Sequence, residues 1–236
     1  MLNAKKNQNN RYLRLISIYL LTAMTIFSTS IFAKPIERIL ILGNSITIHT
    51  PNTAIGWNGN WGMAATEQKY DFPHLLAVLL ENSTSNIRPS LYPKNISDFE
   101  SNNANYDFKK LDFIGNYNPD LVVVFLGDNV KSDKFDAIFF KIQYKNLLQV
   151  ASKTVTHSIF CVGTWWGNRR VDAVISATCG EVGGTFVDIR HISSLPGMKA
   201  ARSGLFSNKG VAAHPSDEGM KSIAEVLFNS ILKAQK

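Results

Sequence analysis

The stretch Ile-Leu-Ile-Leu-Gly-Asn-Ser-Ile-Thr, residues 39–47, contains an unbroken apolar run that ends at Gly43. Such a run predicts a buried strand, and the short polar turn after it predicts the start of a helix. Ser45 is therefore expected at the carboxyl end of a central strand, where ligands sit in open α/β sheets. Its hydroxyl can attack a carbonyl if a base lies nearby, and its N–H can help to hold the oxyanion. Taken alone, the stretch favours a plain helix N-cap.

Strand-like and helix-like patterns alternate along the rest of the chain. Apolar runs predict strands at 36–42, 87–92, 121–126, 158–162 and 185–189. Helical spacing of apolar residues predicts helices at 72–80, 137–151, 171–177 and 217–233, with loops at 50–62 and 191–213 and a polar segment with an amphipathic half at 95–118. Strands separated by helices predict a parallel sheet of about five strands with helices on both faces. We therefore expect one α/β domain over residues 34–236.

The first 33 residues have the pattern of a secretory signal peptide. Four basic residues and no acidic one precede an apolar run at 15–32, and Ala33 offers a cleavage point. An uncleaved anchor is the alternative, since the run approaches ~18 residues. We expect an exported protein, periplasmic or secreted, that touches a membrane only through this segment if it stays uncleaved. Removing these four positive charges lowers the formal net charge from +7 to +3. No cluster of Lys and Arg remains that would predict nucleic-acid binding.

The chain has two cysteines, Cys161 and Cys179. A disulfide between them and two free buried thiols are both compatible with the sequence, because sequence alone does not place their Cα atoms. Neither has another Cys or His at metal-ligand spacing, so we expect no metal site.

Three further features lie where predicted elements end. Asn129 closes the Gly-Asp-Asn that follows the most buried strand, and its side-chain amide is a suitable oxyanion donor. Gly59 and Gly62, in the loop after the Ser45 turn, can let a backbone N–H approach a ligand. His214, fixed by a following proline just before the last helix, can serve as the base for Ser45. Each feature also has a plain interpretation as turn or loop chemistry.

In this order, the features resemble the SGNH (GDSL-like) hydrolase family over nearly the whole chain after the leader. The resemblance implies that Ser45 is the nucleophile and His214 the catalytic histidine. It also implies an oxyanion hole formed by the N–H of Ser45, the N–H of Gly62, with Gly59 as the other candidate, and the amide of Asn129. The family fold is a flavodoxin-like three-layer α/β/α sandwich. Its members are esterases, lipases, thioesterases and carbohydrate deacetylases that need no metal, so we expect no cofactor.

The chain departs from the family pattern at two positions. The first motif has Asn44 where the family has Asp, a mild change because both residues make local turn hydrogen bonds. The family usually has an acid three residues before the histidine, and this position is Val211 here. We therefore expect a Ser–His dyad in which a backbone carbonyl orients the ring N–H, with Asp188 as a less favoured substitute. Loss of the acid is expected to lower the rate, because the acid sets the histidine tautomer.

The expected activity is hydrolysis of a carboxylic ester through an acyl-enzyme, with acetyl on a carbohydrate as the favoured substrate. One of four loop tryptophans is expected to contact the substrate, although tryptophans in loops more often pack against the core edge. These are Trp57, Trp61, Trp165 and Trp166. A lipase or thioesterase of the same family stays open. Two alternatives from other classes also stay open. One is a non-catalytic binding protein on this scaffold, and the other is a phosphate- or nucleotide-binding domain that uses the Gly43 loop.

Overall fold

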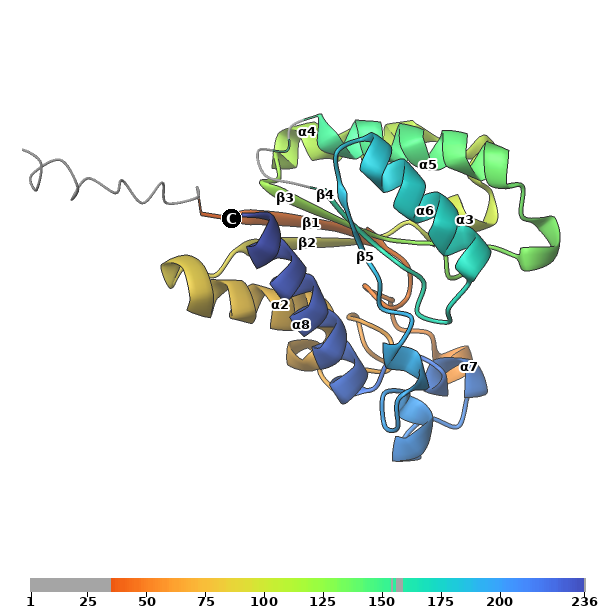
Figure 1. Cartoon of the computed structure of the whole chain (residues 1–236). Helices are drawn as coiled ribbons and strands as arrows, with labels where there is room; N and C mark the ends of the chain where they lie inside the picture. The colour runs from red at the N-terminus through yellow and green to blue at the C-terminus, as the bar shows by residue number, and fades with distance from the viewer. Residues whose placement is uncertain (1–34, 154, 156–158, 236) are drawn as a thin grey trace, which may run out of the picture. The chain divides into compact units, whose positions relative to one another are not determined.

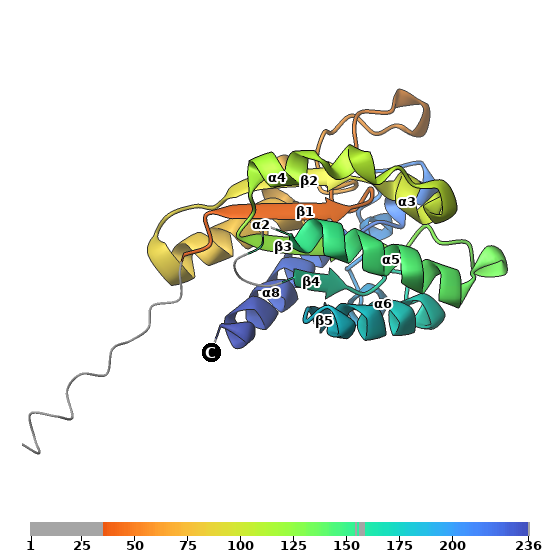
Figure 2. The same cartoon turned by 90° about the horizontal axis from the view of Figure 1, so that it is seen from above.

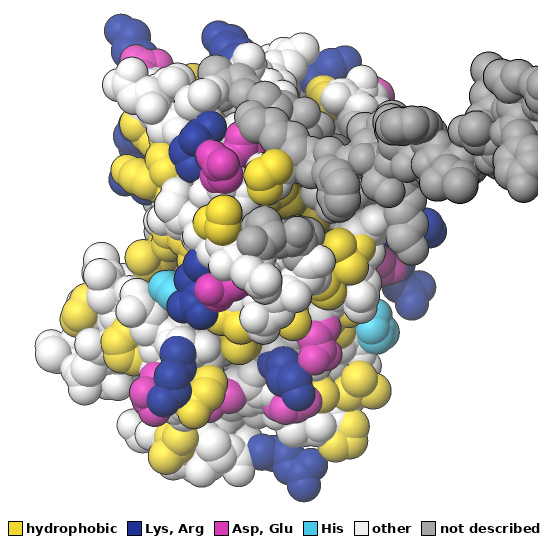
Figure 3. All heavy atoms as spheres, turned by 90° about the vertical axis from the view of Figure 1, so that its left-hand side faces the viewer, with side chains coloured by type: hydrophobic (Ala, Val, Ile, Leu, Met, Phe, Trp, Pro, Cys, Tyr) yellow, Lys and Arg dark blue, Asp and Glu magenta, His cyan; other side chains and the backbone are white. Residues whose placement is uncertain are grey.

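The computed structural model describes residues 35–153, 155 and 159–235. The predicted signal peptide lies outside these residues, and the chain after Lys34 forms one compact unit. Among the described residues, no helix is long and apolar enough to cross a membrane. On the face drawn in Figure 3, Lys and Arg side chains lie beside those of Asp and Glu instead of gathering in a basic patch.

Five parallel strands form the central sheet, in the order β2-β1-β3-β4-β5. The strands are β1 (Arg38–Gly43), β2 (Ser90–Asn95), β3 (Leu121–Phe125), β4 (Ile159–Val162) and β5 (Thr185–Val187). This is the flavodoxin-like order, so the predicted parallel sheet of about five strands is confirmed. Gly43 pairs with Asn95 on one side and Phe125 on the other. The segments that follow β1, β2 and β3 therefore leave the sheet side by side at one edge.

Helices cover both faces of the sheet (Figures 1 and 2). They are α2 (Phe72–Leu80), α3 (Ser97–Ser101), α4 (Phe113–Tyr117), α5 (Ala137–Ser152), α6 (Arg169–Glu181), α7 (Lys209–Ala212) and α8 (Asp217–Ala234). Because side chains alternate along a strand, Ile39 and Ile41 pack with α2 and α8, whereas Leu40 and Leu42 pack with α5 and α6. The predicted three-layer sandwich is therefore present.

Two predicted elements are wrong in position or type. The second strand begins at Ser90 instead of residue 87 and continues through Pro93; this is an edge strand, where a residue without an N–H is tolerated. The helix predicted to begin directly after β1 is absent. Residues 45–47 form a single turn instead, and the chain then runs extended to Thr50. The β-branched residues at 46–48 and 50, followed by Pro51, explain why the turn does not continue as a helix.

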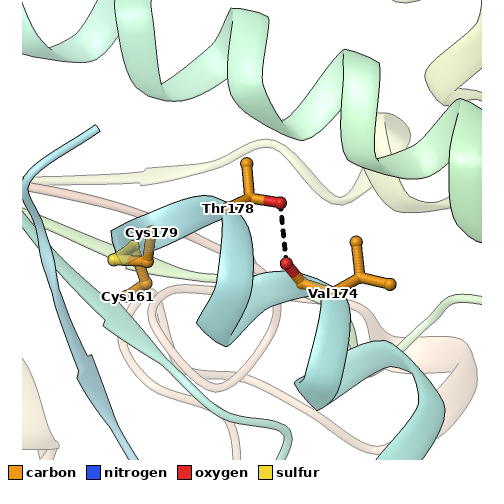
Figure 4. The surroundings of a disulfide bond; sticks show 4 residues. All are labelled: Cys161, Val174, Thr178 and Cys179. Atoms are coloured by element: carbon orange, nitrogen blue, oxygen red, sulfur yellow. Dashed lines mark hydrogen bonds between the residues drawn. A yellow bond between two sulfur atoms is a disulfide. The ribbon is translucent and has the colours of Figure 1, made fainter. Parts of the chain in front are cut away.

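Cys161 and Cys179 form a disulfide that joins β4 to the last turns of α6 (Figure 4). Both cysteines are buried, and no cysteine is free. Of the two states left open by the sequence, the structure has the bridged one. The bond ties the helix covering β4 directly to that strand, and Thr178 beside it donates to the carbonyl of Val174 within α6.

Candidate active site

Ser45 and His214 meet at the edge of the sheet where the strands end. The Ser45 Oγ lies 2.8 Å from the His214 Nε2. Ser45 stands two residues after β1, and His214 lies between α7 and α8, so the pair joins the first strand to the last helical segment. The sequence predicted that these two side chains would meet, and the structure brings them within hydrogen-bond distance.

The turn that carries Ser45 is closed by the Asn44 carbonyl, which accepts from the N–H groups of Thr47 and Ile48. Gly43 is required at its start, because a Cβ there would lie 2.0 Å from the Thr47 hydroxyl oxygen. The predicted helix start at Ser45 is absent, so no helix dipole supports anion binding there. The phosphate-binding alternative therefore has no helix N-terminus directly after the Gly43 loop to support it.

Backbone groups hold the His214 ring and its main chain. The ring Nδ1 lies 2.8 Å from the Gly210 carbonyl oxygen. Because that oxygen only accepts, Nδ1 carries the proton and Nε2 presents a lone pair to Ser45. The His214 carbonyl accepts from Ala200, and the Trp165 indole donates to the preceding Ala213 carbonyl. The expected backbone carbonyl partner is therefore present.

Asp188 does not serve as the substitute acid. Its carboxylate accepts from the guanidinium and the backbone N–H of Arg190. The Arg190 partner lowers the pKa of the Asp188 carboxyl below its usual range. Asp188 is therefore committed to an ion pair just beyond β5, and the Nδ1 of His214 binds the Gly210 carbonyl instead.

His214 is poised as a neutral base. Its side chain is buried, and this burial lowers its pKa below the ordinary value of 6.5. The hydrogen bond to Gly210 opposes this shift, whereas the nearby charge of His49 adds to it. A neutral imidazole with a free Nε2 lone pair is the form that can take a proton from a serine hydroxyl at neutral pH.

Asn129 is held by a buried glutamate that the sequence did not single out. The Asn129 Nδ2 donates to Glu100 Oε2 at 2.6 Å, and its backbone N–H donates to Glu100 Oε1 at 3.2 Å. The other Glu100 Oε1 contacts are the N–H of Gly127 at 2.6 Å and the Asn44 Nδ2 at 3.2 Å. Since an amide nitrogen has two hydrogens, Asn129 keeps one N–H for a ligand. Glu100 is 3% exposed and lies on α3, directly after β2.

Asp128 forms a second carboxylate of the same cluster. Its Oδ2 accepts from Asn44 Nδ2 at 3.4 Å, and its Oδ1 accepts from the N–H of Trp166 at 3.3 Å. Burial, together with the negative charge of Glu100, raises the pKa of Asp128 to about 8. Burial also raises the pKa of Glu100, but four N–H donors oppose this shift. Glu100 accepts four N–H hydrogen bonds and Asp128 accepts two, so we assign the proton to Asp128.

The prediction that Gly62 completes the oxyanion hole is wrong for this structure. Its N–H donates to the Asp71 carboxylate at 3.2 Å, so it is already used inside the protein. Gly62 is required for packing, because a Cβ there would lie 2.7 Å from the Ile46 carbonyl oxygen. Gly59, the other candidate, is a packing glycine too, since a Cβ would lie 2.5 Å from the Trp57 ring.

The four tryptophans have different environments. Trp57 and Trp165 are buried, and their indole N–H groups donate to the carbonyls of His49 and Ala213, so both pack against the core edge. Trp61 is half-buried and lines a shallow cavity of about 390 Å³. Trp166 is 40% exposed, and its ring stands edge-on to that of His214, with 5.3 Å between ring centroids. Trp166 is thus the tryptophan placed against the dyad.

The described residues contain no group of three or more His, Cys, Asp or Glu side chains that is arranged to hold a metal ion. What the site offers instead is a hydroxyl, a neutral imidazole in a fixed tautomer and an amide donor, at one edge of the sheet. This set is suited to nucleophilic attack on a carbonyl.

Comparison with solved structures supports this architecture. TesA overlays with a TM-score of 0.60 at 16% identity, covering 84% of this chain and 99% of that one. The psychrotrophic esterase EstA from Pseudoalteromonas sp., inhibited by monoethylphosphonate, gives 0.56 at 19% identity, over 84% and 97% of the two chains. A two-domain esterase active on acetylated mannans gives 0.58 at 14% identity, over 84% of this chain and 50% of that one. No family model and no curated protein matches the sequence. Proteins described as GDSL-type lipases or lipolytic proteins also overlay, so the chain has the fold of GDSL-type hydrolases.

Proposed function

We propose that the protein is a serine ester hydrolase of the SGNH type. The observation that carries this proposal is the 2.8 Å contact between the Ser45 Oγ and the His214 Nε2. The fold shared with esterases supports it.

The proposed reaction proceeds through an acyl-enzyme. The His214 Nε2 takes the Ser45 proton while Oγ attacks the ester carbonyl. The Gly210 carbonyl stabilises the imidazolium through Nδ1–H, in the position where a triad uses a carboxylate. The Asn129 amide and the N–H of Ser45 hold the oxyanion. Imidazolium then protonates the leaving alcohol, and water activated by the same ring releases the acid.

We propose a short acyl group, such as acetyl on a carbohydrate, as the substrate. Trp166 supports this choice, because a half-exposed indole beside His214 provides a flat wall suited to a sugar ring. A two-domain esterase active on acetylated mannans and a family two carbohydrate esterase from Cellvibrio japonicus share the fold. Lipases and thioesterases stay the alternatives within the same chemistry.

Hydrolysis of p-nitrophenyl esters tests both proposals. We expect turnover of the acetate, a fall in kcat/KM with chain length through butyrate and octanoate, and loss of turnover in Ser45→Ala and His214→Ala. A preference for octanoate would favour a lipase. Turnover that survives Ser45→Ala would contradict the mechanism, and a folded wild-type protein without turnover would favour the non-catalytic binding protein.

We further propose that the protein is exported. The leader pattern predicts export, and the Cys161–Cys179 bridge is the kind that persists in oxidising compartments. Intact-mass measurement of protein recovered from the cell envelope and the medium should find a chain that lacks about 33 residues. Recovery of full-length chain in the membrane fraction would indicate an uncleaved anchor instead.

A further inference from the structure

We propose that Glu100 is a positioning residue for the oxyanion hole, because its carboxylate holds the Asn129 amide in place. This inference rests on the proposed function. Among the described residues, the hydrogen-bond partners of Glu100 are Asn44, Gly127 and Asn129, and neither Ser45 nor His214 is one of them. Its carboxylate instead receives both the side-chain and the backbone N–H of Asn129, at 2.6 and 3.2 Å. Because Glu100 holds both the backbone and the side chain of Asn129, the second N–H of the side-chain amide points in a fixed direction.

The same carboxylate also connects Asn129 to the nucleophile turn. Glu100 Oε1 accepts from Asn44 Nδ2 at 3.2 Å, and Asn44 Oδ1 accepts from the Ile46 N–H at 3.0 Å. Asn44 immediately precedes Ser45, so Glu100 bridges the chain segments that carry the nucleophile and the oxyanion donor. A shift of either segment would break a hydrogen bond to a buried carboxylate, which is costly.

This cluster also accounts for the asparagine at position 44. Its Nδ2 lies between two carboxylates, Glu100 at 3.2 Å and Asp128 at 3.4 Å. An aspartate there would replace this N–H donor by a carboxylate, and its negative charge would be repelled by that of Glu100 in a buried site. The negative charge that the family pattern places beside the serine is supplied here from α3, by Glu100.

Glu100→Gln is the direct test, because it keeps the shape and replaces one acceptor by a donor. Three N–H donors meet Oε1 and one meets Oε2, so the Gln oxygen should take the Oε1 position and its nitrogen the Oε2 position. There the nitrogen faces the Asn129 Nδ2, and the Asn129 amide loses its alignment. We expect kcat for p-nitrophenyl acetate to fall about 100-fold, the size seen when an oxyanion donor is removed, with KM changed less than about threefold. Glu100→Asp, which keeps the charge but withdraws it by one methylene, should lower kcat about tenfold and fold normally.

A double-mutant cycle with Asn129→Ala separates positioning from a merely structural role. If Glu100 acts through Asn129, Glu100→Gln should cost less than about threefold in kcat once the Asn129 side chain is gone. Asp120→Asn is the matched control. Asp120 is also buried and accepts the N–H groups of Glu37 and Arg38, but it lies at the opposite end of β3. Its replacement should lower the thermal midpoint and leave kcat unchanged.

The outcomes separate the two proposals. Full kcat in Glu100→Asp, or equal losses from Glu100→Gln with and without Asn129, would overturn the positioning role while Ser45-dependent turnover stands. Absence of Ser45-dependent turnover in the folded wild-type protein would overturn the proposed function and, with it, this role.

Discussion

The Nδ1–H of His214 donates to the Gly210 carbonyl at 2.8 Å, four residues earlier in the chain. Hydrolases with a Ser-His-Asp triad place a carboxylate at this point. A carbonyl dipole fixes the same tautomer but carries no net charge, so it stabilises the imidazolium less. The His214 ring is therefore oriented as in a triad, but the negative charge of the carboxylate is absent.

Restoring an acid at the family position should not improve this site. Val211 is 1% exposed and packs in an apolar cluster with Trp57 and Met63. Val211→Asp would bury a carboxylate among apolar groups, and we expect a loss of unfolding free energy on the order of 3 kcal/mol without a gain in kcat. Thermal unfolding measures the loss of stability, and p-nitrophenyl acetate kinetics measure kcat. A rise in kcat at an unchanged midpoint would show that the acid reaches the ring. Asp188→Asn, the control, should leave kcat unaltered.

The pH dependence of hydrolysis should reflect the lowered pKa of His214. The ring works only when neutral, and its burial lowers the pKa below 6.5. As pH rises, kcat/KM should therefore climb to its plateau through a midpoint below 6.5. Measurement from pH 4.5 to 8 in buffers of constant ionic strength tests this. A midpoint at or above 6.5 would contradict this prediction, because it would mean that the folded protein stabilises the protonated form of the ring.

Asp128 should make stability fall as pH rises. Its folded pKa of about 8 exceeds the ordinary value of 3.8, so between these values the folded state binds the extra proton and loses stability with increasing pH. Asp128→Asn imitates the protonated form and should raise the thermal midpoint more at pH 7.5 than at pH 5. An equal change at both pH values would contradict the assignment of the proton to Asp128.

The disulfide should contribute strongly to stability. Cys161 and Cys179 are 18 residues apart, and closing a loop of this length stabilises a protein by about 3 kcal/mol. Urea unfolding of the double variant Cys161→Ala/Cys179→Ala should show a loss of this size. Reductant should lower the free energy of unfolding of the wild-type protein by nearly the same amount. It should leave the free energy of unfolding of the double variant unchanged. A response of the variant to reductant would point to an effect unrelated to this bond.

Local patterns predicted most of the scaffold. The apolar runs at β1, β3 and β4 are buried on both faces of the sheet, so their composition alone marks them as central strands. Strand β2 lies at the edge and has half-exposed side chains, which explains why its position was predicted three residues early. The sequence did not predict the turn after β1 correctly, because a polar turn after a strand also resembles a helix cap.

The site was only partly predictable. Ser45, Asn129 and His214 follow strands or precede a helix, and the sheet topology brings such positions together. Gly62 failed because a glycine required for close packing looks the same in a sequence as one that exposes its N–H. Glu100 was missed because it lies in a polar segment among other acids, and its burial depends on contacts with segments that follow two different strands. Long-range hydrogen bonding of this kind has no local sequence signal.

The proposed mechanism requires Ser45 to be a nucleophile that His214 activates. Mass spectrometry after reaction with a fluorophosphonate is the sharpest test of this role, because the reagent bonds to an activated serine. We expect one adduct, on the peptide containing Ser45, formed at a rate reduced about 100-fold or more in His214→Ala. An adduct on another residue, or labelling of Ser45 at an unchanged rate without His214, would contradict it.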